Sequence, residues 1–239
     1  MKMKALGFDL GEPTQGMTRA IFDLDGTLCD PAEGIVKSLN HALVALGHCA
    51  RPGPELLRYI GPPLRAVFAD LLSTTEKGVL SSGIALYRER YGRVGYSESR
   101  LYEGIEEALA DLRGRGCRLY VATSKRQDFA EQVLGHLGIR AFFCQVLGCD
   151  LDRSKADVLR GITASAAGAA WVVVGDRESD FLAADEVGIP SIGVRWGYGS
   201  DGELARASLI VSCPNRLPEA IENAAQPLLR RGRAEPPGM

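Results

Sequence analysis

Short apolar segments alternate along this chain with longer segments in which apolar residues recur every three or four positions. The short apolar runs predict β-strands, and the longer periodic stretches predict amphipathic helices. The expected strands cover residues 20–22, 118–122, 142–147, 171–174, 191–194 and 209–212. The expected helices between them cover residues 104–112, 127–137, 155–166 and 181–187. This alternation predicts an α/β fold whose core is a doubly wound parallel sheet.

A long interval after the first expected strand breaks the alternation, because residues 31–99 contain no convincing strand. The periodic stretches within it predict a small helical bundle and cover residues 32–46, 55–59, 64–72 and 77–91. An insertion at this point of the chain would lie over the carboxyl ends of the strands. The short segments 28–31 and 99–102 would then serve as hinges.

These patterns give the expected domain boundaries. The core is expected to comprise residues 18–30 and 100–225, and the inserted α-helical cap domain residues 31–99. The two ends of the chain, residues 1–17 and 226–239, are expected to be flexible.

The composition narrows the possible partners. The chain has 239 residues, of which 46% are hydrophobic and 24% charged, and its net charge of −2 gives no basic surface for nucleic acid. No apolar run approaches the roughly 18 residues that a membrane span requires. The apolar stretch after the basic start is interrupted by Asp9 and Glu12, so a signal peptide is not expected. We expect a cytoplasmic monomer or homodimer without nucleic-acid or membrane partners.

Two carboxylates, Asp23 and Asp25, follow the first expected strand. Residues two apart in extended chain point the same way, so both side chains can face one spot at the carboxyl end of the strand. Open α/β sheets bind ligands at that edge. The same letters also fit a strand followed by a common Asp-Gly turn, which would carry no chemistry.

Further polar residues follow later strands. Thr123 and Ser124 end one expected strand, Lys155 begins a helix, and Asp176 follows another strand with Asp180 four residues later. Each has an ordinary structural alternative: a helix cap for the hydroxyls, a solvated side chain for the lysine, and turn or cap positions for the acids. Their order behind the first pair of acids favours one reaction centre.

In their joint order and spacing, these motifs resemble the haloacid dehalogenase (HAD) superfamily of aspartate-nucleophile phosphatases. The matching stretches are Asp23-Leu-Asp25-Gly-Thr27, Thr123-Ser124, Lys155 and Gly175-Asp176-Arg-Glu-Ser-Asp180. The resemblance implies a Rossmann-like core with a helical cap, a Mg²⁺ cofactor and a small phosphorylated substrate. Mg²⁺ suits such chemistry because it takes oxygen ligands and bridges carboxylates and phosphate.

The resemblance also implies the catalytic roles. Asp23 would be the nucleophile that forms an aspartyl-phosphate. Asp25 would protonate the leaving oxygen and later deprotonate the attacking water. Thr123 would donate a hydrogen bond to the phosphoryl group, and Lys155 would place a fixed positive charge beside it.

The metal ligands implied by the resemblance are four acids. Asp23 and Asp176 would bind Mg²⁺ through their carboxylates, and Asp25 through its backbone carbonyl. Asp180 would support or complete this ligand shell.

Five further residues are expected to bind the substrate. Gly26 and Thr27 are expected to leave backbone N–H groups free to hold the phosphate. Ser124 is expected beside them. Lys125 and Arg65 are candidates for binding a second anionic group of the substrate, although either is equally well explained as a solvated cation.

Several features select a branch of the superfamily. Asp25 argues against a haloacid dehalogenase proper, and Thr27 resembles the phosphatase form of the motif. Residues 59–65, 123–125 and 196–199 resemble the phosphoglycolate-phosphatase-like branch, which includes 5′-nucleotidase-like members. We therefore predict a Mg²⁺-dependent phosphatase for a small, phosphoglycolate-like monoester. A 5′-nucleotidase and a catalytically idle binding or regulatory protein of the same fold are the alternatives.

Overall fold

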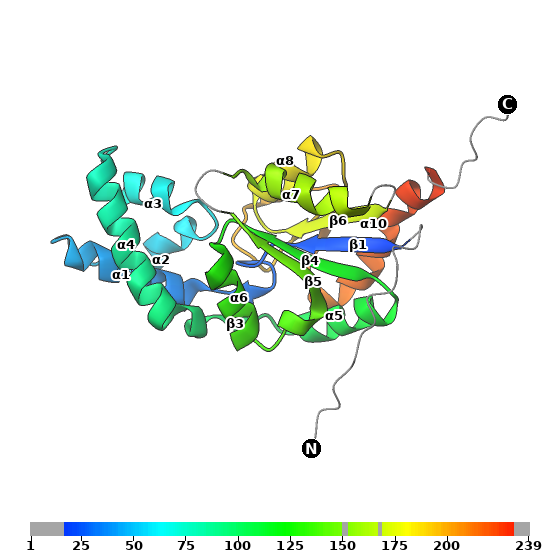
Figure 1. Ribbon diagram of the computed structural model, residues 1–239, viewed down its shortest axis with the longest axis horizontal. Helices are drawn as coiled ribbons and strands as arrows, with labels where there is room; N and C mark the ends of the chain where they lie inside the picture. Colours follow the sequence, from blue (N-terminus) through cyan, green and yellow to red (C-terminus); the bar gives the residue numbers. More distant parts are fainter. Residues whose placement is uncertain (1–16, 150–152, 167–168, 232–239) are drawn as a thin grey trace, which may run out of the picture.

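The core of the protein is a six-stranded parallel sheet (Figure 1). The computed structural model describes residues 17–149, 153–166 and 169–231. The strands, in their order across the sheet, are β5 (Phe143–Gly148), β4 (Arg118–Thr123), β1 (Thr18–Phe22), β6 (Ala170–Gly175), β7 (Ser191–Val194) and β8 (Leu209–Val211). All neighbouring strands pair in parallel. The chain runs outward from β1 through β4 and β5 and then returns to β6, so the order reverses beside β1.

Helices cover both faces of this sheet. The core helices are α5 (Ile105–Gly114), α6 (Gln127–His136), α7 (Lys155–Thr163), α8 (Glu178–Glu186), α9 (Asp201–Leu204) and α10 (Leu217–Arg231). Successive strand residues point to opposite faces. Ala20 and Phe22 of β1 pack in the cluster that contains residues of α5, α6 and α10, whereas Ile21 packs with α7 and α8. The predicted doubly wound α/β core is confirmed.

The insertion from Ala32 to Glu98 is helical. It contains α1 (Ala32–Ala45), α2 (Gly53–Leu56) with the 3₁₀ turn η1 (Leu57–Tyr59), α3 (Leu64–Leu71), α4 (Lys77–Arg93) and the 3₁₀ turn η2 (Gly95–Glu98). These elements share their own apolar cluster, which includes Leu39, Phe68 and Tyr91. Phe129 of α6 joins this cluster, so the inserted helices pack directly on the core.

The two chain crossings between core and cap lie side by side. Strand β2 (Cys29–Asp30) pairs antiparallel with β3 (Arg100–Leu101). The sequence pattern predicted hinges at these positions but no strands, because a two-residue strand has no periodicity to detect. The pairing brings the entry and exit of the cap to one point.

The carboxyl-terminal helix differs from expectation. Helix α10 continues to Arg231, past residue 226, where we expected a flexible end to begin. Leu217, Ile221 and Ala225 recur at helical spacing and are buried in the core cluster, and Leu228 continues this apolar face past residue 226 and packs against the same cluster. The expected flexible ends otherwise fall largely on residues 1–16 and 232–239, which lie outside the described residues. Across the described ranges, none of the helices combines the length and apolar character needed to cross a bilayer.

Candidate active site

The candidate catalytic residues meet at the carboxyl ends of three adjacent strands. Asp23 directly follows β1, Thr123 ends β4 and Asp176 directly follows β6. Lys155 is the first residue of α7, and Asp180 lies in the first turn of α8. The sheet topology therefore assembles residues from four separate stretches of sequence at the point where the strand order reverses, the usual ligand site of open α/β sheets.

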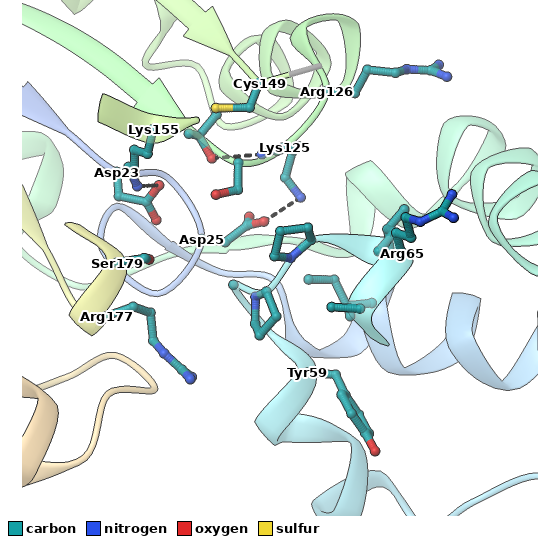
Figure 2. A pocket seen from close by; sticks show the side chains of 18 of the residues that line it. Asp23, Asp25, Tyr59, Arg65, Lys125, Arg126, Cys149, Lys155, Arg177 and Ser179 are labelled. Carbon is teal, nitrogen blue, oxygen red and sulfur yellow. Dashed lines mark hydrogen bonds and ion pairs between the residues drawn. The ribbon is translucent and has the colours of Figure 1, made fainter. Parts of the chain in front are cut away.

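Three buried carboxylates and one lysine form the centre of the site. Oxygen atoms of Asp23, Asp176 and Asp180 lie within 4.8 Å of one another. The Lys155 ammonium nitrogen (Nζ) lies 2.6 Å from Asp23 Oδ1 and also pairs with Asp180 (Figure 2 shows the contact with Asp23). Burial lowers the pKa of Lys155, but the carboxylates of Asp180 and Asp23 outweigh it and raise that pKa above its ordinary value.

The negative charge of the three carboxylates exceeds the positive charge of Lys155, the cation that pairs with two of them. Burial, with contributions from Asp23 and Asp180, raises the pKa of Asp176 to about 8. Burial also raises the pKa of Asp23 to about 6, although Lys155 opposes this. These shifts report a deficit of positive charge among oxygen ligands. A divalent cation with a preference for oxygen, such as Mg²⁺, fits this donor set.

Asp176 is held tightly by its neighbours. Its Oδ1 accepts a hydrogen bond from the Thr27 hydroxyl at 3.0 Å, and its Oδ2 accepts one from the Tyr198 N–H at 2.8 Å. A Cβ at Gly26 would lie 2.7 Å from Asp176 Cγ, and Gly26 has a φ of +87°. Glycine is therefore required at this position for both its conformation and its lack of a side chain.

The phosphate-binding role expected for Gly26 and Thr27 is not supported by the loop geometry. The Gly26 N–H donates to Cys29 O at 2.8 Å, and the Thr27 N–H points to Leu24 O at 3.4 Å. Both groups are engaged within the loop that follows β1, so the prediction that they are free anion donors is wrong. The structure instead gives both residues contacts with Asp176.

Asp25 pairs with a second buried lysine. Lys125 Nζ lies 2.6 Å from Asp25 Oδ2 and donates to the Tyr91 hydroxyl at 2.8 Å (Figure 2 shows the Asp25 contact). Lys125 was expected to bind the substrate's second anion, but its ammonium group is buried and already contacts these two residues. Neither Tyr91 nor its contact with Lys125 was predicted.

The remaining candidates line the same cavity. Thr123 is buried, and its hydroxyl accepts a hydrogen bond from the Lys125 N–H at 3.3 Å, a contact that shapes the turn after β4. Thr123 also lines the cavity in which the substrate would lie. Ser124 is half-buried at the cavity wall. Arg65 is exposed at the start of α3, and Figure 2 shows its side chain directed away from Asp23 and Asp25.

The cavity lies between core and cap and has a volume of about 930 Å³. The core contributes the acids and lysines described above except Asp176, and the cap contributes mainly apolar and aromatic side chains, among them Ile35, Tyr59 and Leu64. A further contact between the two parts was not anticipated. The Arg177 guanidinium donates to the carbonyl of Ile60 in the cap at 3.2 Å.

A loop near the end of the core also proved to belong to the site. Residues 196–199, which were expected only to mark the branch of the superfamily, contact it directly: Trp196 Nε1 donates to Thr27 O at 3.0 Å, and the Tyr198 N–H donates to Asp176. The Tyr198 hydroxyl also donates to Asp30 at the entrance to the cap. The Gly-Tyr-Gly spacing was the available signal, because close approach to Asp176 requires glycine at both flanking positions.

Comparison with known proteins agrees with this geometry. A family model described as haloacid dehalogenase-like hydrolase matches residues 20–194. The chain therefore belongs to the haloacid dehalogenase-like hydrolase family, and the predicted superfamily is confirmed. This membership and the relatives described next support a phosphatase.

Three curated relatives carry different names. A 5′-nucleotidase from Pseudomonas aeruginosa is 39% identical, over 77% of this chain and 85% of the relative. The tyrosine-protein kinase PtkA from Mycobacterium tuberculosis is 36% identical, over 83% of this chain and 69% of the relative. A phosphoglycolate phosphatase from Agrobacterium fabrum is 34% identical, over 75% of this chain and 81% of the relative.

Solved structures share the whole architecture. The crystal structure of a predicted phosphatase from Clostridium acetobutylicum superimposes with a TM-score of 0.81 at 34% identity. The match covers 87% of this chain and 99% of that one. The similarity therefore extends over the sheet and the inserted helices together.

Proposed function

We propose that this protein is a Mg²⁺-dependent phosphatase that hydrolyses a small phosphate monoester through an aspartyl-phosphate on Asp23. The observation that carries this proposal is the placement of Asp23 at the end of β1, in contact with Lys155 and beside the carboxylates of Asp176 and Asp180. Family membership supports it. Because the core acids are present and assembled, the catalytically idle alternative has no support.

The proposed chemistry uses two carboxylates in sequence. The Asp23 carboxylate attacks phosphorus, the bond from phosphorus to the ester oxygen breaks, and Asp25 gives its proton to that oxygen. A water then attacks the phosphorus of the aspartyl-phosphate, Asp25 takes the water's proton, and phosphate leaves with Asp23 restored. Lys155 fixes the Asp23 carboxylate through Oδ1 and supplies positive charge to the reacting group.

The metal would be held by Asp23 and Asp176, with the Asp25 carbonyl as a further ligand and Asp180 in support. When bound there, Mg²⁺ supplies the positive charge that offsets the repulsion between a phosphate dianion and an anionic nucleophile. Asp180 has a second contact, because its Oδ2 accepts the Arg177 N–H at 2.9 Å and so fixes the start of α8. This contact favours a supporting role for Asp180.

Two substrate classes are candidates. A phosphoglycolate-like monoester is the first, and a relative with that activity in its name supports it. A nucleoside monophosphate is the second, since a cavity of about 930 Å³ with aromatic walls leaves room for a base and a sugar. The name of the Pseudomonas aeruginosa relative agrees with the second class. We also propose that the protein acts in the cytoplasm, as a monomer or a homodimer.

A phosphate-release assay with a panel of monoesters tests this function. The panel should contain phosphoglycolate, nucleoside 5′-monophosphates and p-nitrophenyl phosphate, each with Mg²⁺ and with excess EDTA. We expect Mg²⁺-dependent turnover that is abolished in Asp23→Asn, because an amide cannot form the aspartyl-phosphate. Substantial activity of pure, folded Asp23→Asn would overturn the assignment of the nucleophile.

A further inference from the structure

We propose that Lys125 is a positioning residue for Asp25, and that Tyr91 of the cap holds Lys125 in place. The inference rests on the proposed function, in which Asp25 transfers protons. It assigns to Lys125 a role in orienting the acid–base group rather than in binding the substrate's tail. It also means that a residue of the cap, Tyr91, helps to orient Asp25 through Lys125.

The contact between Lys125 and Asp25 is buried and engages only one carboxylate oxygen. Lys125 Nζ lies 2.6 Å from Asp25 Oδ2, and the two side chains are 6% and 11% exposed. A buried ion pair is costly to break, so the Asp25 side chain is confined to one orientation. Oδ1 of Asp25 is also buried, and within the described part of the chain it has no hydrogen-bond partner.

This asymmetry suits proton transfer. A general acid or base needs a fixed orientation and an oxygen that is not committed to another partner. Oδ2 supplies the fixed point through Lys125, and Oδ1 remains for the proton that passes to the leaving oxygen or from the water. Asp25 lines the cavity between core and cap, where the substrate would lie.

Tyr91 fixes Lys125 from the cap side. Lys125 Nζ donates to the Tyr91 hydroxyl at 2.8 Å and lies 4.5 Å from the centre of its ring. Tyr91 is fully buried, stacks on Tyr87 at 5.5 Å and contacts the Phe129 ring at 5.2 Å. This aromatic packing gives the hydroxyl a defined place.

The three residues come from separate parts of the molecule. Asp25 lies in the loop after β1, Lys125 lies just beyond β4, and Tyr91 belongs to α4 of the cap. A displacement of the cap would withdraw the Tyr91 hydroxyl from Lys125 and loosen the fixed point of Asp25. The orientation of Asp25 therefore depends on the cap being packed against the core.

The experiment compares phenyl phosphate with p-nitrophenyl phosphate in the Mg²⁺-loaded enzyme. The two substrates have nearly the same shape, and neither carries a second anionic group. Phenolate is the more basic leaving group and depends on protonation, whereas p-nitrophenolate leaves without it. The ratio kcat/KM reports the steps up to the aspartyl-phosphate, so it isolates the transfer of a proton to the leaving group.

In Lys125→Met we expect kcat/KM for phenyl phosphate to fall about 100-fold, the lower range for loss of general acid–base catalysis. The value for p-nitrophenyl phosphate should fall by less than about 10-fold on the same reasoning. Tyr91→Phe, which keeps the ring and removes the hydroxyl, should give a smaller loss with the same preference. Tyr120→Phe removes the hydroxyl of another buried tyrosine, which does not line the cavity, and should leave both values unchanged.

Three results would overturn the inference. Equal losses on both aryl substrates would assign Lys125 to stability alone. A loss confined to phosphoglycolate, which carries a second anion, would assign it to substrate binding. If Lys125→Met does not fold, Tyr91→Phe decides, and an absence of leaving-group preference there would reject the role.

Asp25→Asn separates this inference from the proposed function. A selective loss on phenyl phosphate in Asp25→Asn, combined with no selectivity in Lys125→Met and Tyr91→Phe, would reject the positioning role and leave the proposed function standing. Wild-type turnover of phenyl phosphate by Asp25→Asn would instead reject Asp25 as the acid, and both proposals would fail together.

Discussion

Removal of Lys155 should destabilise the metal-free protein strongly, in a manner that depends on pH. Lys155→Met keeps much of the side-chain length but deletes the charge that pairs with Asp23 and Asp180. The three side chains are only 9%, 9% and 1% exposed, so water cannot replace the lost partner. Breaking a buried pair while its carboxylates remain costs about 3–5 kcal/mol.

The pH dependence follows from the pKa of Asp23, which is already raised to about 6. Lys155 is the group that opposes this rise, so its removal raises the pKa of Asp23 further. A carboxyl with a higher pKa in the folded than in the unfolded protein favours folding at acid pH, and that contribution is lost as pH rises through the folded value. The loss in free energy of unfolding caused by Lys155→Met should therefore be largest near pH 8 and smallest near pH 5.

Urea unfolding in EDTA at the two pH values measures this difference. Arg216→Met serves as the control, because it removes a cation from the exposed pair with Glu219 and should change stability little at either pH. A deficit for Lys155→Met below about 1 kcal/mol at pH 8, the size expected of an exposed pair, would refute the account of the site as a buried charge cluster. A deficit that grows toward acid pH would refute the stated role of Asp23.

Three further outcomes are expected. Excess EDTA should stop turnover and added Mg²⁺ should restore it, and full activity in EDTA would count against the metal. Because burial raises the pKa of Asp176 to about 8, protons compete with Mg²⁺ for this carboxylate, and the Mg²⁺ affinity measured by titration calorimetry should fall from pH 8 to pH 6. Gly26→Ala should lower both Mg²⁺ affinity and thermal stability, because the added Cβ would clash with Asp176. Gly114→Ala, where the added Cβ meets open space, should change neither, and equal melting temperatures for the two variants would contradict the packing argument. If Arg65 swings inward to bind a second anion, Arg65→Ala should raise KM for phosphoglycolate and spare p-nitrophenyl phosphate, and parallel losses would remove it from the list of substrate-binding residues.

The sequence was sufficient to predict that the candidate catalytic residues come together, because parallel strands place their carboxyl ends at one edge of the sheet. Asp23, Thr123 and Asp176 each follow an apolar strand, so their convergence needed only the strand–helix alternation. The contact between Lys125 and Tyr91 depends on how the cap sits on the core, and residue spacing carries no information about that. The N–H groups of Gly26 and Thr27 were misjudged because their partners depend on the exact path of the loop.

The paired crossings at β2 and β3 make the cap a replaceable module. Cys29 faces Leu101 and Asp30 faces Arg100, so the chain leaves the core and returns to it between neighbouring strands. Backbones paired in this way lie about 5 Å apart, a gap that a tight turn closes. The helical insertion can therefore be exchanged for a cap of another size, or shortened to a hairpin, without moving the strands that carry the reacting acids. New substrate preferences become accessible to this scaffold by exchange of one continuous segment, provided that the new cap keeps a group in the place of Tyr91 to hold Lys125.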